Sequence, residues 1–141
     1  MVRTTGNDPG EQRVIDDVQR HGWHLVGIPD DPEGPAFVYS IGMFHTLGHP
    51  EIIMLGLNST AAMAQIINSV GEAVHNGARF DDWHESDQVL DGYSCMFRAV
   101  PPDVYPEYLG YAMWFYRPDD FPVLQCVWPD AQHNYPWHPD C

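Results

Sequence analysis

The sequence contains no lysine, so all six of its basic residues are arginine, against twenty Asp and Glu. Without lysine the chain cannot form a Schiff base with pyridoxal phosphate or with a carbonyl substrate. It also lacks the GK[ST] ending of a phosphate-binding loop. The net charge of −14 opposes binding to nucleic acid and to anionic membranes, which relies on Lys and Arg. We therefore expect neither a nucleic-acid partner nor a membrane partner.

Long apolar runs are also missing. The longest runs from Ile52 to Leu57 and is far shorter than the roughly 20 residues that cross a bilayer. The first twelve residues contain no apolar signal-peptide core, so we expect a cytoplasmic protein. The three cysteines, Cys95, Cys126 and Cys141, form no CxxC pair, which argues against a disulfide framework and a zinc ribbon.

The residues that are present predict one folded domain. Hydrophobic residues make up 44% of the 141 and charged residues 18%, enough apolar surface for a core. We expect a flexible N-terminus over residues 1–10 and a single α+β domain over 11–141. Apolar alternation and runs predict strands at residues 23–28, 36–42, 51–57, 93–100 and 121–128.

Helical periodicity and capping residues predict helices at residues 11–21, from the caps at 58–60 to Gly77, and at 106–116. Gly48 and Pro50 favour a loop at residues 43–50, and residues 78–92 are typical of an acidic loop or an edge segment. The order of these elements predicts a largely antiparallel sheet of about five strands, with two to three helices packed against one face.

Several longer motifs recur in a known combination. They are FVYSIGMFHTLGHPEIIMLGL, HNGARF, YPEYLGYAMWFY and FPVLQCVWPD. Together they resemble the bacterial family of domains of unknown function numbered 4262 (DUF4262), over roughly residues 22–137. The resemblance implies the domain assignment, but it implies no activity, cofactor or residue role. The family's recurrent elements fall here on Tyr39, Gly42, Gly48, His49, Pro50, Glu51, Gln125, Trp128, Pro129 and Asp130.

The segment HTLGHPE, residues 45–51, holds the densest group of chemically active side chains. His45, His49 and Glu51 are a 2-His-1-carboxylate set of the kind that binds zinc or iron. Alternatively, His49 acts as an acid–base group that Glu51 orients. The third interpretation is structural, with His49 and Glu51 hydrogen-bonded to the loop backbone. No motif identifies a cofactor.

A second group of polar and aromatic side chains extends the candidate site. Tyr39, His45, Gln125, Trp128 and Asp130 are candidate binding residues, because aromatic rings beside polar groups suit a flat ligand or a partner surface. We expect a pocket between the HTLGHPE segment and the last strand. The sequence thus favours a module that binds a small molecule or a protein partner, including a second copy of the chain. The alternatives are a small-molecule enzyme that uses His49 and Glu51, and a metal-dependent version of it.

Overall fold

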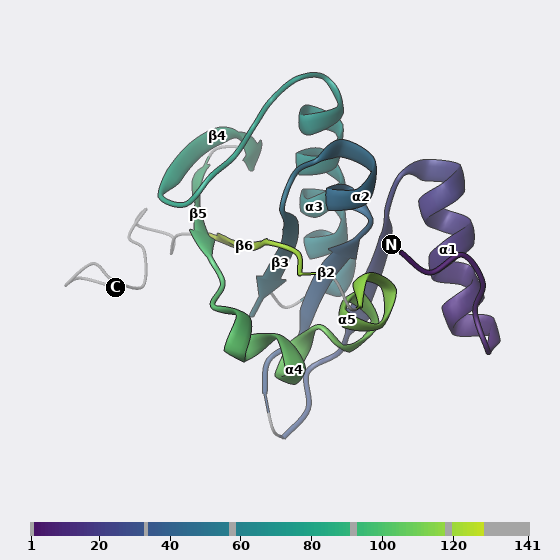
Figure 1. Ribbon diagram of the computed structural model, residues 1–141. Coiled ribbons are helices and arrows are strands. Elements are labelled where there is room, and N and C mark those ends of the chain that lie inside the picture. The colour runs from purple at the N-terminus through teal and green to yellow at the C-terminus, as the bar shows by residue number, and fades with distance from the viewer. Residues whose placement is uncertain (1, 33, 57–58, 91–92, 118–119, 129–141) are drawn as a thin grey trace.

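The computed structural model describes residues 2–32, 34–56, 59–90, 93–117 and 120–128 (Figure 1). The helices are α1 (Pro9–His21), α2 (Met43–Leu47), α3 (Thr60–His75), α4 (Tyr105–Tyr108) and α5 (Gly110–Tyr116), with a 3-10 turn at Pro102–Val104. The strands are β1 (His24–Ile28), β2 (Phe37–Ile41), β3 (Glu51–Leu55), β4 (His84–Leu90), β5 (Tyr93–Ala99) and β6 (Val123–Val127). In these ranges, no helix is long and apolar enough to cross a membrane.

The strands form one mixed sheet in the order β1-β2-β3-β6-β5-β4. Only β3 and β6 run parallel, and the other neighbours are antiparallel, so the expected α+β class is confirmed. The expectation of five strands was wrong by one. The sixth is β4, which pairs with β5 at the edge of the sheet. It lies inside residues 78–92, which were expected to be an acidic loop or an edge segment.

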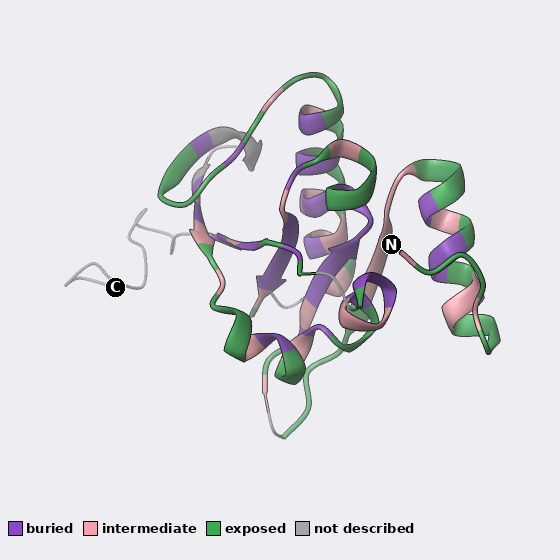
Figure 2. Cartoon of the chain, viewed as in Figure 1, coloured by how far each residue is buried: buried purple, intermediate pink, exposed green. Residues whose placement is uncertain are grey.

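Helices cover both faces of the sheet, whereas helices on one face were expected. Apolar side chains of α3 pack on the face that carries Val38, Ile52 and Met54. The opposite face, with Tyr39 and Ile53, is covered by α1, α4 and α5. Figure 2 shows the buried residues gathered along one side of α1 and of α3. The central strands β2 and β3 are buried on both sides because apolar residues occupy both phases of their alternation.

More helices form than the two to three expected. The predicted helix over 106–116 is interrupted at Leu109, whose φ of −112° and ψ of 38° separate α4 from α5. Residues 43–47, expected to be a loop, form the short helix α2, which ends before Gly48. The glycine and proline that argued against a helix therefore act only after its last turn.

Helix α1 begins at Pro9, inside the segment expected to be flexible. The side chain of Asp8 caps it by accepting a hydrogen bond from the Glu11 amide, and Val14, Ile15 and Val18 are buried. Ahead of it, the Arg3 amide donates to the Phe115 carbonyl, 3.1 Å away. The described part of the N-terminus thus contacts α5, while its flexibility stays a prediction.

Helix α3 packs closely against Trp23, the residue before β1, because Gly71 has no side chain. Val70 and Val74 face the core, but at Gly71 the ring of Trp23 occupies the space that a side chain would need. A Cβ at Gly71 would lie 2.4 Å from Cζ2 of Trp23. The indole cannot swing away freely because its Nε1 donates to Oδ1 of Asn68 at 3.0 Å.

Gly71→Ala is therefore expected to destabilise the protein by about 1–2 kcal/mol, since the overpacking cost outweighs the gain in helix propensity. Urea unfolding measures the change, with the exposed Ser69→Ala in the same helix as control. Combining Gly71→Ala with Trp23→Leu should recover part of the loss, and strictly additive effects would contradict the contact.

Candidate functional site

Glu51, the first residue of β3, is fully buried and accepts hydrogen bonds from the start of α2. Its Oε2 accepts from the amides of Gly42 and Phe44, at 2.9 Å and 3.1 Å, and its Oε1 from the amide of Met43 at 3.1 Å. These amides are among the four that a helix leaves without an intrahelical acceptor. The carboxylate therefore caps α2 from the following strand, where its charge also complements the helix dipole.

Two hydroxyl groups complete the cradle around the carboxylate. Ser40 donates to Oε1 at 2.7 Å and accepts from the Ile52 amide at 2.9 Å. Tyr116 donates to Oε2 and accepts from the His45 amide. Because each hydroxyl already accepts from a backbone amide, its single proton is free to point at Glu51. The cradle consists of donors only and is suited to an ionised carboxylate.

Burial changes the pKa values of Glu51 and Tyr116. Full burial raises the pKa of the Glu51 carboxyl, and the hydrogen bonds from Tyr116, Ser40 and the helix amides oppose that rise. Burial, reinforced by the negative charge of Glu51, also raises the pKa of Tyr116, so the phenol keeps its proton. The pair is held together by a donated hydrogen bond rather than by two opposite charges.

Gly42 allows the backbone to turn into this cradle. Its φ of 113° lies in the left-handed region, and a Cβ there would lie 2.8 Å from both the Gly22 carbonyl oxygen and Cγ2 of Val18. A larger residue would push α2 away from α1. Gly42 is one of the recurrent positions of the family that the sequence resembles, and no role was expected for it. Its contacts give it a structural role.

His49 is buried on another side of the same corner. Its Nδ1 lies 2.9 Å from the Pro50 carbonyl oxygen, and its Nε2 accepts from the Phe80 amide at 3.0 Å. These partners require a neutral ring with its proton on Nδ1. Burial lowers the pKa of His49 below its usual 6.5, against the effect of the Pro50 hydrogen bond. Both ring nitrogens are therefore engaged: Nδ1 bonds within the corner itself, and Nε2 joins the corner to the segment before β4.

The expected pairing of His49 with Glu51 was wrong. Glu51 does not orient the imidazole, because His49 bonds to Pro50 and Phe80 while Glu51 faces α2 and Tyr116. His45 is exposed, with its ring edge-on to Phe115. Within the described ranges, no three His, Cys, Asp or Glu side chains could hold a metal ion, so His45, His49 and Glu51 form no ligand set there.

The other candidate binding residues do not converge either. Tyr39 is buried, which raises its pKa to about 12. Trp128 packs with the α3 side of the sheet and donates from Nε1 to the Leu55 carbonyl at 3.1 Å. Gln125 alternates with Leu124 and Cys126, which face α3, so its side chain lies on the opposite face. Asp130 lies outside the described residues.

Gln125 does line a hollow on that face. The hollow has a volume of about 260 Å³ and is bordered by β3, β6, the end of β5 and the turn that leads into α4. We call it the Gln125 hollow, and its lining residues are Ile53, Leu55, Ala99, Val100, Pro101, Val104, Tyr108 and Gln125. Within the part of the chain that the structure describes, the half-buried Gln125 amide has no hydrogen bond, and it is open to solvent, because no buried side-chain nitrogen or oxygen there lacks a partner.

Sequence reasoning missed several of these residues. Ser40, Tyr108 and Tyr116 were not among the candidate site residues. Each belongs to a different element from its partner, and no local spacing connects Tyr116 with Glu51. The one available signal was the position of Glu51 itself, a carboxylate at the head of an otherwise apolar strand.

A family model described as a domain of unknown function, DUF4262, matches residues 17–141. The match contains β1 to β6 and every site residue discussed above. No curated protein and no solved structure matches the chain.

Glu51→Gln is expected to lower the free energy of unfolding by about 3 kcal/mol or more. The carboxamide nitrogen cannot accept, so buried donors at the start of α2 lose their acceptor. Chemical denaturation measures the loss, with the exposed Glu107→Gln as the matched control. Equal stability of the two variants would show that the cradle does not depend on the carboxylate.

His49→Gln is expected to cost about 2 kcal/mol near neutral pH, because the amide only approximates the two ring hydrogen bonds. It should also flatten the pH dependence of stability. Because the pKa of folded His49 is lowered, its contribution is complete above its usual 6.5 and is lost as pH falls below that value. Unfolding free energies at about pH 7.5 and about pH 5.5 test this.

Comparing the wild type with His49→Gln separates the pH dependence of stability that is due to His49 from the part that is due to Glu51. A raised pKa makes the contribution of Glu51 fall as pH rises above its usual 4.5, and this change is common to both proteins. The exposed His75→Gln serves as control and should keep the wild-type slope. A His49→Gln variant with an unchanged slope would rule out the assigned neutral ring.

Proposed function

Since the chain belongs to the DUF4262 family, which carries no assigned activity, we propose its function from its geometry: a module that binds a small, mainly apolar molecule in the Gln125 hollow. The unpartnered amide of Gln125 among apolar side chains is the observation that carries this proposal. Ligand sites commonly combine an apolar lining with a few polar groups that fix orientation.

The hollow sets the chemistry of the ligand. Ile53, Leu55, Val100 and Val104 offer aliphatic walls, and the half-buried Tyr108 adds an aromatic one. An amide presents both a donor and an acceptor. A fitting ligand is therefore a small flat molecule with one amide-like edge. Its volume is limited by the roughly 260 Å³ available.

The neighbourhood of Gln125 supports the same face. Its cross-strand partner on β5 is Arg98, whose guanidinium stacks over Trp83 at 3.4 Å and binds Asp82 at 2.8 Å. Trp83 is 55% exposed and has a φ of 64°, which is unusual for a residue other than glycine. Arg98, stacked on an aromatic ring, therefore lies next in sequence to Ala99, which borders the hollow.

The other functions expected from the sequence receive less support. Acid–base catalysis by His49 and Glu51 stays a prediction, and the hydrogen bonds that occupy both groups argue against it. Binding to a protein partner and self-association also stay predictions.

Benzamide and toluene distinguish the two parts of the proposed site. We expect benzamide to bind more tightly than toluene, because only benzamide can pair with the Gln125 amide. Gln125→Leu should remove about tenfold of the affinity for benzamide, which corresponds to one hydrogen bond of about 1.4 kcal/mol. Ligand-observed NMR titration provides the affinities.

Two further variants complete this experiment. Val104→Phe, which fills the hollow, should weaken both probes, while Gln65→Leu on the exposed side of α3 should change neither. The absence of benzamide binding to the wild type, or equal binding to Gln125→Leu, would refute the proposed site.

A further inference from the structure

Asp17 on α1 and His24 at the start of β1 form a carboxylate–imidazole pair. Oδ2 of Asp17 lies 2.6 Å from Nδ1 of His24, and the two side chains are 33% and 15% exposed. A carboxylate accepts at Nδ1, so in the neutral ring the proton lies on Nδ1 and the lone pair on Nε2. In the described part of the chain, Nε2 has no hydrogen-bond partner.

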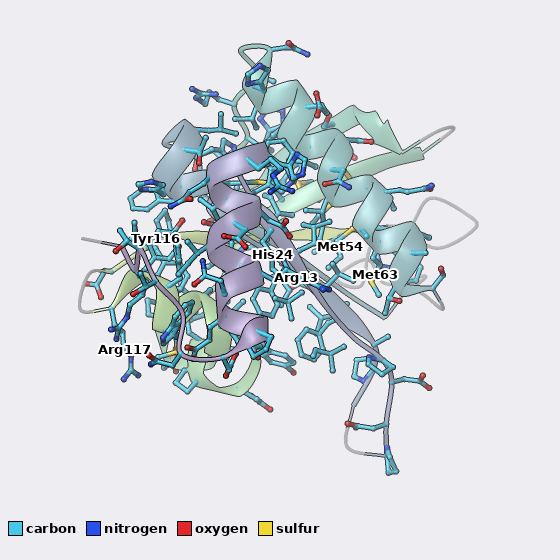
Figure 3. The ribbon with its side chains drawn as sticks, turned by 90° about the vertical axis from the view of Figure 1, so that its right-hand side faces the viewer. Arg13, His24, Met54, Met63, Tyr116 and Arg117 are labelled. Carbon is cyan, nitrogen blue, oxygen red and sulfur yellow. The ribbon has the colours of Figure 1, made fainter. Side chains whose placement is uncertain are left out.

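The imidazole lies in a groove at the free edge of the sheet. The groove has a volume of about 640 Å³ and lies along β1 between α1 and α3. Its lining residues are Arg13, Asp17, His21, Trp23, His24, Leu25, Asn68 and Glu72. Figure 3 looks onto this edge and labels Arg13 and His24 in the region between the two helices.

One wall of this groove is rigid. The indole of Trp23 is fixed by its hydrogen bond to Asn68 and by its close approach to Gly71. On the α1 side, Asp17 bonds to Nδ1 of the imidazole. His24 is therefore oriented from one side and open on the other, as a general base requires.

Arg13 supplies a charge for recognition on the α1 wall. Among the residues that the structure describes, its guanidinium has no hydrogen bond or ion pair, although acids greatly outnumber bases in the chain. Asp17 is engaged with His24, and Glu72 lies across the groove on α3. A guanidinium binds carboxylate and phosphate groups through paired N–H donors.

We propose that this groove is an acid–base site for a small organic anion, in which Arg13 holds the oxyanion and His24 accepts a proton from a water or hydroxyl group. Asp17 is a positioning residue that keeps the lone pair of Nε2 directed into the groove. The site is independent of the Gln125 hollow, which lies on a different part of the sheet. Failure of either proposal therefore leaves the other intact.

Ester hydrolysis tests the proposed base. In this reaction Nε2 takes a proton from water, the resulting hydroxide oxygen bonds to the acyl carbon, and the ester C–O bond breaks to release 4-nitrophenolate. The probes are mono-4-nitrophenyl glutarate, which carries a carboxylate, and the neutral 4-nitrophenyl acetate. His24→Gln should lose about tenfold or more of the protein-dependent rate with both esters.

The remaining variants separate binding from proton transfer. Arg13→Gln should raise KM for the glutarate ester alone and leave kcat unchanged, since it removes the oxyanion contact. Asp17→Asn should lower kcat with KM unchanged, since it disturbs only the orientation of the imidazole. The exposed His75→Gln on α3 is the matched control and should retain the wild-type rate.

Three results would overturn the proposal. They are equal rates for His24→Gln and His75→Gln, an Arg13→Gln effect that is the same for both esters, and a wild type no faster than buffer. Should a variant fail to fold, diethyl pyrocarbonate labelling of the wild type replaces it. Mass spectrometry should then find His24 modified faster than His75, and equal or slower modification of His24 would equally refute the site.

Discussion

The carboxylate of Glu51 is the group on which the central corner of this domain depends. It satisfies the first amides of α2 and binds Ser40 of β2 and Tyr116 of α5. A helix as short as α2 is not stable by itself, because its few internal hydrogen bonds do not repay the cost of nucleation. The buried acceptor stabilises the helix and joins it to the neighbouring strand β2 and to Tyr116 of α5, which lies 65 residues further along the chain.

This arrangement explains why the residues with the most reactive side chains are not the best functional candidates. His49 and Glu51 have their hydrogen-bonding capacity filled by the protein itself, so neither has a free atom for a ligand. The more informative groups are polar atoms that the fold positions but leaves without a partner. Gln125 in its hollow and Nε2 of His24 in the groove along β1 are of this kind. Each lies beside a wall that is already packed.

Much of the fold was predictable from local patterns. The apolar periodicity of residues 63–74 and the cap at Ser59 predicted α3, and apolar runs predicted five of the strands. Predictions failed where a distant contact decides the local structure. Helix α2 depends on Glu51, which Tyr116 of α5 helps to hold, and the break at Leu109 separates two short helices that share one apolar cluster with the Tyr39 face of the sheet. Of the candidate site residues, Gln125 lines a hollow in the described part of the chain, and its place on the last strand was visible in the sequence.

Composition and periodicity alone establish which chemistry is unavailable, the α+β class and the apolar residues on both sides of β3. Both are local properties, so they can be read from the sequence without knowing the tertiary contacts. Only the tertiary structure decided that helices cover both faces of the sheet, that His49 and Glu51 point to different partners, and that Asp17 meets His24 at the sheet edge. These outcomes depend on how separate elements pack against one another. Side-chain contacts between elements, unlike periodicity within one, leave no fixed spacing in the sequence.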